Sequence, residues 1–165
     1  MPDQTVHLPS IAATYSHRVR PLRLFKLACL TMALSRAAWL VWHRFPVWNP
    51  AQRQQAIQHW ARSVLVLLQV EVVCKTPPGT LPAGLLVCNH LSWLDVLVLQ
   101  SVVPAVFVAK SEVQSWPLVG KLAQACATLF VQRASARSAR AMVEGAATSL
   151  AQGLSVVAFP EGTSS

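Results

Sequence analysis

The stretch GLLVCNHLSWLD, residues 84–95, marks the point where the pattern of the chain changes and decides the fold. Its first half, Gly84 to Asn89, is an apolar run with the length of a buried strand. A helix is predicted to follow from about Ser92 to Val102. A fully apolar strand that leads directly into a helix is typical of an α/β fold, in which helices cover both faces of a parallel sheet.

The rest of the chain continues this alternation. Three further strands and two further helices are predicted from apolar run length and helical periodicity. They are the strands AVFVAK, TLFVQR and LSVVAFP, and the helices Lys121 to Cys126 and about Ala136 to Gln152. Upstream, QVEVVCKT is predicted as a short strand that ends at the turn TPPGT. We therefore expect an α/β domain over residues 69–165, with a mostly parallel sheet flanked by helices and buried on both faces.

Two amphipathic helices are predicted to precede this domain, within residues 1–68. Asn49 can cap the second helix, and Pro50 suits its first position. The first helix spans about Leu22 to Trp42. Its longest uncharged run, Leu27 to Ser35, is far shorter than the roughly 20 residues that cross a bilayer, so the pattern does not favour a transmembrane helix.

The charged side chains of this first helix lie on one side of it. Arg23, Lys26 and Arg36 share one arc at helical periodicity. The remaining face is mostly apolar and includes Leu22, Phe25, Cys29, Met32, Ala33 and Leu40. This pattern is typical of a membrane-associated helix that lies in the interface and directs basic side chains to lipid headgroups. The alternative is a helix packed on the domain's own core.

The composition favours contact with an anionic membrane surface. Of the 165 residues, 53% are hydrophobic and only 12% are charged, which indicates apolar contacts outside the protein's own core. The formal net charge is +8, and residues 1–62 hold eight Lys and Arg residues against a single acidic residue. Nucleic-acid-binding proteins usually carry their cations on a polar face, so an apolar basic segment favours lipid. Scattered cysteines are typical of free thiols in a reducing compartment, and we expect the cytoplasmic face of a membrane.

His90 and Asp95 are the first candidates for chemistry. His90 directly follows the predicted strand, and open α/β sheets place their ligand sites at the carboxyl ends of strands. An imidazole can take a proton from a hydroxyl group at neutral pH, and a carboxylate on its other nitrogen holds the tautomer. The alternative for Asp95 is a capping box with Ser92, and the alternative for His90 is a hydrogen bond at the same helix start.

Two further features follow the ends of predicted strands. FPEGTSS, residues 159–165, contains a tight turn whose amides can hold an anion, and Glu161 can accept hydrogen bonds from hydroxyl groups. Arg133 ends the strand TLFVQR, where a guanidinium group can clamp a phosphate. Taken singly, a solvated turn and a surface arginine are the simpler interpretations. Together with His90, however, both features are predicted at the same edge of one sheet.

This combination, in this order, resembles the glycerolipid acyltransferase family, and most closely the 1-acylglycerol-3-phosphate (lysophosphatidate) acyltransferases. NHLSWLD is similar to the family's motif of His, four residues and Asp, ATLFVQR to its second block, and FPEGTSS to its third. AKSEVQSWPLVG, residues 109–120, is similar to the segment between the first two blocks. The resemblance covers about residues 71–165.

The resemblance implies an O-acyltransferase that moves a fatty acyl group from acyl-CoA or acyl carrier protein to the free hydroxyl of a lysophospholipid. With 1-acylglycerol-3-phosphate as acceptor, the product is phosphatidic acid, in phospholipid biosynthesis. His90 would take the acceptor proton, and Asp95 would orient His90. The substrate-binding residues that the resemblance implies are Arg133, Glu161, Gly162, Thr163 and Lys110. No metal or other cofactor is implied, and the expected partners are the lysolipid, the acyl donor and an anionic membrane surface.

Two features depart from the family pattern. The third block most often continues with Arg after the Thr, whereas Ser164 stands there, which makes another acceptor, such as a lyso-ornithine lipid, more credible. The chain also stops at Ser165, directly after the third block, where family members continue with more sheet. We therefore expect the α/β domain to be incomplete at its C-terminus.

Two other functions are consistent with the same residues. Cys88 and His90 point the same way on an extended segment, which would suit a thiol hydrolase, although a cysteine within a buried run is usually inert. A non-catalytic adaptor at the membrane surface would use the α/β domain only as structure. Transfer activity that survives the loss of the thiol would exclude the hydrolase, and biological function that survives the loss of His90 would support the adaptor.

Overall fold

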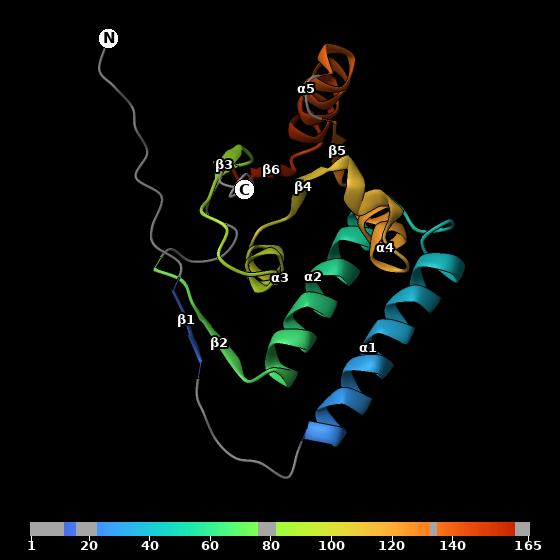
Figure 1. The fold of residues 1–165 in the computed structure, drawn as a ribbon, viewed down its shortest axis with the longest axis vertical. Helices are drawn as coiled ribbons and strands as arrows, with labels where there is room; N and C mark the ends of the chain where they lie inside the picture. Colours follow the sequence, from blue (N-terminus) through green and yellow to red (C-terminus); the bar gives the residue numbers. More distant parts are fainter. Residues whose placement is uncertain (1–11, 16–22, 76–81, 133–134, 161–165) are drawn as a thin grey trace.

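The structure, a computed structural model, describes residues 12–15, 23–75, 82–132 and 135–160. Its centre is a sheet of four parallel strands flanked by helices, and two long helices precede it (Figure 1). The predicted α/β fold class is confirmed. The elements of this part, in chain order, are β3 (Leu85–Val87), α3 (Leu94–Val102), β4 (Ala105–Lys110), the 3-10 helix η1 (Ser111–Ser115), α4 (Val119–Ala125), β5 (Leu129–Val131), α5 (Ala136–Ala151) and β6 (Ser155–Ala158).

The strand order of the main sheet is β3-β6-β4-β5, and every pair is parallel. β6, the last strand in sequence, lies between β3 and β4, with Val156 opposite both Leu85 and Val106. Because all four strands run the same way, their carboxyl ends meet at one edge of the sheet. The loops that follow β3, β4, β5 and β6 therefore leave the sheet at this shared edge.

The two edge strands, β3 and β5, are less buried than predicted, and β3 departs furthest. Only Leu86 is buried, whereas Leu85 and Val87 are 62% and 55% exposed. Leu86 packs against Leu99 of α3, and side chains alternate along a strand, so Leu85 and Val87 point to the opposite face. The prediction of a sheet buried on both faces is therefore wrong at this edge strand.

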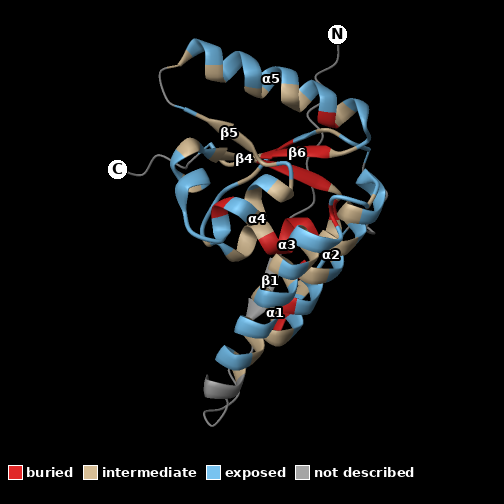
Figure 2. Ribbon diagram, turned by 90° about the vertical axis from the view of Figure 1, so that its right-hand side faces the viewer, coloured by how far each residue is buried: buried red, intermediate tan, exposed pale blue. Residues whose placement is uncertain are grey.

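α3 lies between the sheet and the preceding helix α2 (Pro50–Leu67), with buried residues on both sides (Figure 2). One buried cluster joins α3 to α2 and to the strand that follows α2, and it contains Ala61, Val64, Leu65, Val70, Leu97 and Val98. A second cluster joins α3 to the sheet, and it contains Leu86, Leu99, Val103, Ala105, Phe107 and Val157. The helix that follows His90 is thus held by apolar packing on two faces.

Two short elements were not predicted. β1 (Ala12–Tyr15) pairs antiparallel with β2 (Val70–Val73), and this two-stranded sheet is separate from the main one. β2 itself was predicted as a strand, and that prediction is confirmed. The 3-10 helix η1 was also missed, because its five residues are too short for a periodic signal.

The second N-terminal helix begins as the sequence predicts. Asn49 accepts a hydrogen bond from the amide of Gln52, and the Gln52 side chain accepts one from the amide of Asn49, at 2.9 and 3.0 Å. Pro50 occupies the first helical position of α2. α1 (Arg23–His43) lies alongside α2 (Figure 1), where the Trp60 indole donates a hydrogen bond of 3.0 Å to the carbonyl of Ala33.

The orientation of α1 differs from the prediction. Lys26, expected among the cations that reach lipid headgroups, donates a hydrogen bond of 2.8 Å to Gln69 beyond the end of α2. Three residues expected on the free apolar face are half-buried, namely Cys29, Ala33 and Leu40. Met32 of that face is exposed as predicted, and the other exposed large apolar side chains of α1 are Leu27, Trp39 and Trp42. One face of α1 thus packs on the protein, as the alternative interpretation held, and the other exposes apolar surface.

None of the helices in the described part of the chain combines enough length with enough apolar character to cross a bilayer.

Candidate active site

His90 and Asp95 meet in the structure. His90 lies in the loop between β3 and α3, and Asp95 is the second residue of α3. Nδ1 of His90 is 3.3 Å from Oδ2 of Asp95, and the two side chains are 35% and 30% exposed. Imidazole and carboxylate are therefore in contact at a position that solvent and substrate can reach. Nε2 of His90, on the far side of the ring from Asp95, is the nitrogen that this arrangement leaves for a substrate.

The carboxylate of Asp95 is held by the backbone of the same loop. Its Oδ2 accepts hydrogen bonds from the amides of Leu91 and Ser92, at 2.7 and 2.8 Å. The hydroxyl of Ser92 accepts one from the amide of Leu94 at 3.3 Å. The capping interpretation and the catalytic interpretation of Asp95 are thus compatible, because one oxygen both holds the helix start and faces His90.

The aromatic ring of Phe159 covers one face of His90. The ring centroids are 4.3 Å apart, and the planes differ by 25°. Phe159 directly follows β6, the strand next to β3 in the sheet. This contact could not be predicted, because Phe159 is far from His90 in the sequence and only the strand order β3-β6 brings the two rings together.

The remaining predicted site residues are partly outside the described chain. Lys110 ends β4 and is exposed at the shared carboxyl edge of the sheet, with β6 between its strand and β3. Arg133 lies outside the described residues, as do Glu161, Gly162 and Thr163. β5 and β6, which lead to these four residues, end at that same edge.

Cys88 is poorly suited to act as a nucleophile. Burial of the thiol, and secondly the negative charge of Asp95, raise the pKa of Cys88 above its ordinary value. A thiol needs a lowered pKa to provide the reactive thiolate at neutral pH. The environment of Cys88 thus argues against the thiol hydrolase.

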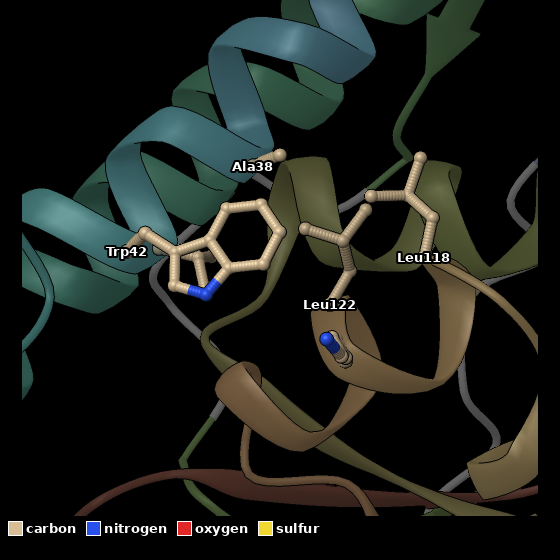
Figure 3. Close-up of a pocket in the computed structure, with 6 residues that line it drawn as sticks. Ala38, Trp42, Leu118 and Leu122 are labelled. Carbon is tan, nitrogen blue, oxygen red and sulfur yellow. The ribbon is translucent and has the colours of Figure 1, made fainter.

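A small pocket lies apart from His90, between α1 and the segment that begins α4 (Figure 3). Its volume is about 30 Å³, and its lining is apolar except for one lysine: Ala38, Val41, Trp42, Leu118, Lys121 and Leu122. The ammonium group of Lys121 lies 5.4 Å from the centre of the Trp42 ring. A volume of this size is far too small for a lipid or a thioester substrate.

Among the described residues, no group of three or more His, Cys, Asp or Glu residues is placed to hold a metal ion.

Comparison with known proteins gives a consistent match. The model of the family "Acyltransferase" matches residues 69–165. The chain is 44% identical over 108 residues to a lyso-ornithine lipid O-acyltransferase of Rhizobium meliloti (strain 1021), covering 66% of this chain and 37% of the relative. It is 36% identical over 117 residues to a 1-acyl-sn-glycerol-3-phosphate acyltransferase of Neisseria meningitidis serogroup B, covering 70% and 46%. The chain thus spans less than half the length of these curated relatives.

A solved structure has the same fold. The crystal structure of the 1-acyl-sn-glycerophosphate (LPA) acyltransferase PlsC from Thermotoga maritima superposes with a TM-score of 0.63, over 87% of this chain and 61% of that one. The sequences are 24% identical, so this likeness concerns the fold alone.

Proposed function

The chain belongs to the Acyltransferase family, and from this premise we propose that it transfers a fatty acyl group from an acyl thioester to the free hydroxyl of a lysophospholipid. The observation that carries the proposal is the contact between His90 and Asp95 at the carboxyl edge of the sheet. We assign these two residues to the His and Asp of the family's motif, which NHLSWLD resembles. Acyl-CoA or acyl carrier protein would serve as donor.

The chemistry follows from the geometry of the pair. Nε2 of His90 takes the proton of the acceptor hydroxyl while the hydroxyl oxygen attacks the carbonyl carbon of the thioester. The new ester bond forms, the carbon–sulfur bond breaks, and the thiol leaves with the proton that His90 returns. Asp95, itself held by two amides, keeps Nδ1 protonated and stabilises the positive charge that develops on the ring.

The acceptor that we propose is 1-acylglycerol-3-phosphate, which gives phosphatidic acid. Its phosphate and glycerol groups would be bound by residues that lie outside the described chain or at the sheet edge, namely Arg133, Glu161, Gly162, Thr163 and Lys110. Ser164 favours a second candidate, a lyso-ornithine lipid, because it removes a cation from the phosphate site. The relative from Rhizobium meliloti, which is 44% identical, is named for this second acceptor, lyso-ornithine lipid.

Apolar side chains beside the site support a lipid acceptor. Leu91 and Trp93 follow His90 in the same loop, and they are 90% and 60% exposed. Exposed large apolar side chains next to a polar pair suit a substrate with an acyl chain and a polar head.

We also propose that the protein docks on an anionic membrane surface, at its cytoplasmic face. Trp39 and Trp42 of α1 and Leu118 and Val119 at the start of α4, here called the α1–α4 surface, are all exposed. Figure 3 shows Trp42 and Leu118 on facing elements, and Lys121 lies beside them. Tryptophan and lysine together are typical of protein surfaces at the level of lipid headgroups.

A thiol-release assay tests the proposed activity. It should use the longest natural form of the protein that contains residues 1–165, with acyl-CoA and a panel of lysolipids in mixed micelles. We expect thiol release that requires an acceptor and that falls to background in His90→Ala, with His59→Ala as the matched control. We expect Arg133→Ala mainly to raise the KM for a phosphate-bearing acceptor.

The panel also separates the alternatives. Preference for lysophosphatidate or for lyso-ornithine lipid identifies the acceptor. A folded, vesicle-bound protein that releases no thiol with any acceptor would contradict the transferase and favour a membrane-surface adaptor.

A further inference from the structure

The imidazole of His90 is contacted from two directions, by Asp95 at the start of α3 and by Phe159 directly after β6. Asp95 contacts its edge at 3.3 Å, and Phe159 covers its face at a centroid distance of 4.3 Å. We propose that Phe159 is a positioning residue that fixes the plane of the His90 ring and so aims Nε2 at the acceptor hydroxyl. This inference rests on the proposed function, because it assigns Phe159 a role in the acyl transfer.

Phe159 is anchored to the centre of the sheet. It directly follows β6, which pairs with β3 on one side and β4 on the other. The amide of Cys88 donates a hydrogen bond of 3.1 Å to the carbonyl of Ala158, so the backbones before Phe159 and before His90 are joined. The Phe159 ring also packs against the buried cluster between α3 and the sheet.

A second aromatic ring lies on the core side of Phe159. Phe107 of β4 is buried, and its ring centroid lies 6.2 Å from that of Phe159, with the planes 23° apart. The rings of Phe107, Phe159 and His90 therefore form a row from the core to the site, in which neighbouring planes differ by 23° and 25°. A ring that rests on the core in this way gives His90 a surface with little freedom to move.

This contact restricts a motion that Asp95 leaves open. The contact at Nδ1 places one edge of the imidazole, but the ring can still swing about the line from Nδ1 to the carboxylate. An aromatic surface against the face opposes that swing, and a misplacement of about 1 Å can reduce a rate by about 100-fold. Phe159 also lies two residues before Glu161, so it links the proposed base to the proposed acceptor-binding turn.

Three variants test the role by kinetics. Phe159→Leu removes the aromatic surface, Phe159→Tyr keeps it, and Phe107→Leu makes the same chemical change one ring further from His90. We expect Phe159→Leu to lower kcat by at least about tenfold while the acceptor KM changes by less than about twofold, since positioning acts on the chemical step. Phe159→Tyr should keep most of the wild-type kcat. Phe107→Leu should lower Tm, because Phe107 is buried, and should lower kcat less than Phe159→Leu does, because Phe107 acts on His90 only through Phe159.

A spectroscopic signature tests the stacking without any turnover. In the wild type, the ring current of Phe159 should shift the carbon-bound ring protons of His90 upfield, with the resonances assigned by their absence in His90→Ala. The shift should be lost in Phe159→Leu and kept in Phe159→Tyr and Phe107→Leu.

The outcomes distinguish this inference from the proposed function. A wild-type kcat in Phe159→Leu, or equal losses in the Leu and Tyr variants, would overturn the positioning role while leaving the transferase intact. Equal losses of kcat in Phe159→Leu and Phe107→Leu would assign the effect to core packing and also overturn it. If the wild type releases no thiol with any acceptor, the proposed function fails and the positioning role falls with it, whatever the ring-current shift.

Discussion

The His90 loop and the α1–α4 surface are both open to solvent, but they differ in how their side chains are held. In the loop, the carboxylate of Asp95 is bound by two amides and faces an imidazole that is itself stacked on Phe159. On the α1–α4 surface, Trp39, Trp42 and Val119 are each about half exposed, at 53%, 59% and 47%. The first region has the fixed polar geometry that a reaction needs. The second has exposed apolar area of the kind that suits contact with lipid.

The α1–α4 surface also contains a backbone turn with a positive φ angle at Leu118. Leu118 has φ 61° and ψ −55°, and the amide of Val119 bonds to the carbonyl of Pro117 at 2.6 Å, which together make a tight turn of three residues. Such a turn strains a non-glycine residue, and it presents Leu118 toward α1 (Figure 3). The exposed apolar side chain of Leu118 thus stands on a strained backbone.

The largest loss of activity is expected at Asp95, and it tests whether the His90 loop is catalytic. Asp95→Asn keeps the size of the side chain but no longer holds the correct tautomer of His90, so kcat should fall by roughly 100- to 10,000-fold. The thiol-release assay measures this loss, and Glu144→Gln on the surface of α5 is the matched control. Similar activities in the two variants would show that the fixed polar geometry of the loop is not used for catalysis.

The next effect concerns the turn that supports the α1–α4 surface. A Cβ on Gly120 would collide with the backbone carbonyl of Gln114 in η1, so Gly120→Ala should destabilise the fold by about 1–3 kcal/mol. Gly145→Ala is the control, because its Cβ would meet only the movable side chain of Leu129, at 2.8 Å, and alanine favours a helix. Thermal unfolding of both variants compares them, and an equal Tm would contradict the tight packing of η1 on α4.

A smaller effect is expected on the α1–α4 surface, and it tests whether that surface binds lipid. The double variant Trp39→Ser, Trp42→Ser should bind vesicles of anionic phospholipid about tenfold more weakly, because indole rings favour the membrane interface. Val143→Ser, which removes a 59% exposed apolar side chain on α5, should bind like the wild type. Co-sedimentation measures the binding, and unchanged binding of the double variant would reject the α1–α4 surface as the docking site.

The smallest effect is expected at Cys88. Cys88→Ser should keep transfer within about twofold of the wild type, since a thiol whose pKa is raised holds little thiolate at neutral pH. For the same reason, alkylation of Cys88 followed by mass spectrometry should be slow at neutral pH and should increase as the pH rises above the ordinary range of a thiol. Rapid alkylation of Cys88 at neutral pH, together with loss of transfer in Cys88→Ser, would favour the thiol hydrolase interpretation again.

The fold class and the first site pair could be predicted because their signals are local. The helical period of residues 50–67 and the apolar run of residues 105–110 locate a helix and a strand wherever these segments pack. His90 and Asp95 are five residues apart on a strand–loop–helix unit, so chain geometry alone allows them to meet. The shared edge of the site could also be predicted, because the carboxyl ends of parallel strands meet at one edge in any strand order.

The face that α1 turns outward could not be predicted in the same way. The charge pattern placed Lys26 toward lipid, but packing on α2 brings Lys26 to Gln69 and leaves Trp39 and Trp42 outside. A helix with apolar residues on more than one side has no single preferred face, so the neighbouring helices decide its rotation.

By itself, the sequence determined the alternation of strands and helices, the capped start of α2 and the proximity of His90 to Asp95, since each depends on residues close together in the chain. The tertiary structure decided the strand order β3-β6-β4-β5, and with it the stacking of Phe159 on His90. These features depend on contacts between segments about 70 residues apart, where local periodicity carries no signal and only the packing of the whole sheet selects the neighbours.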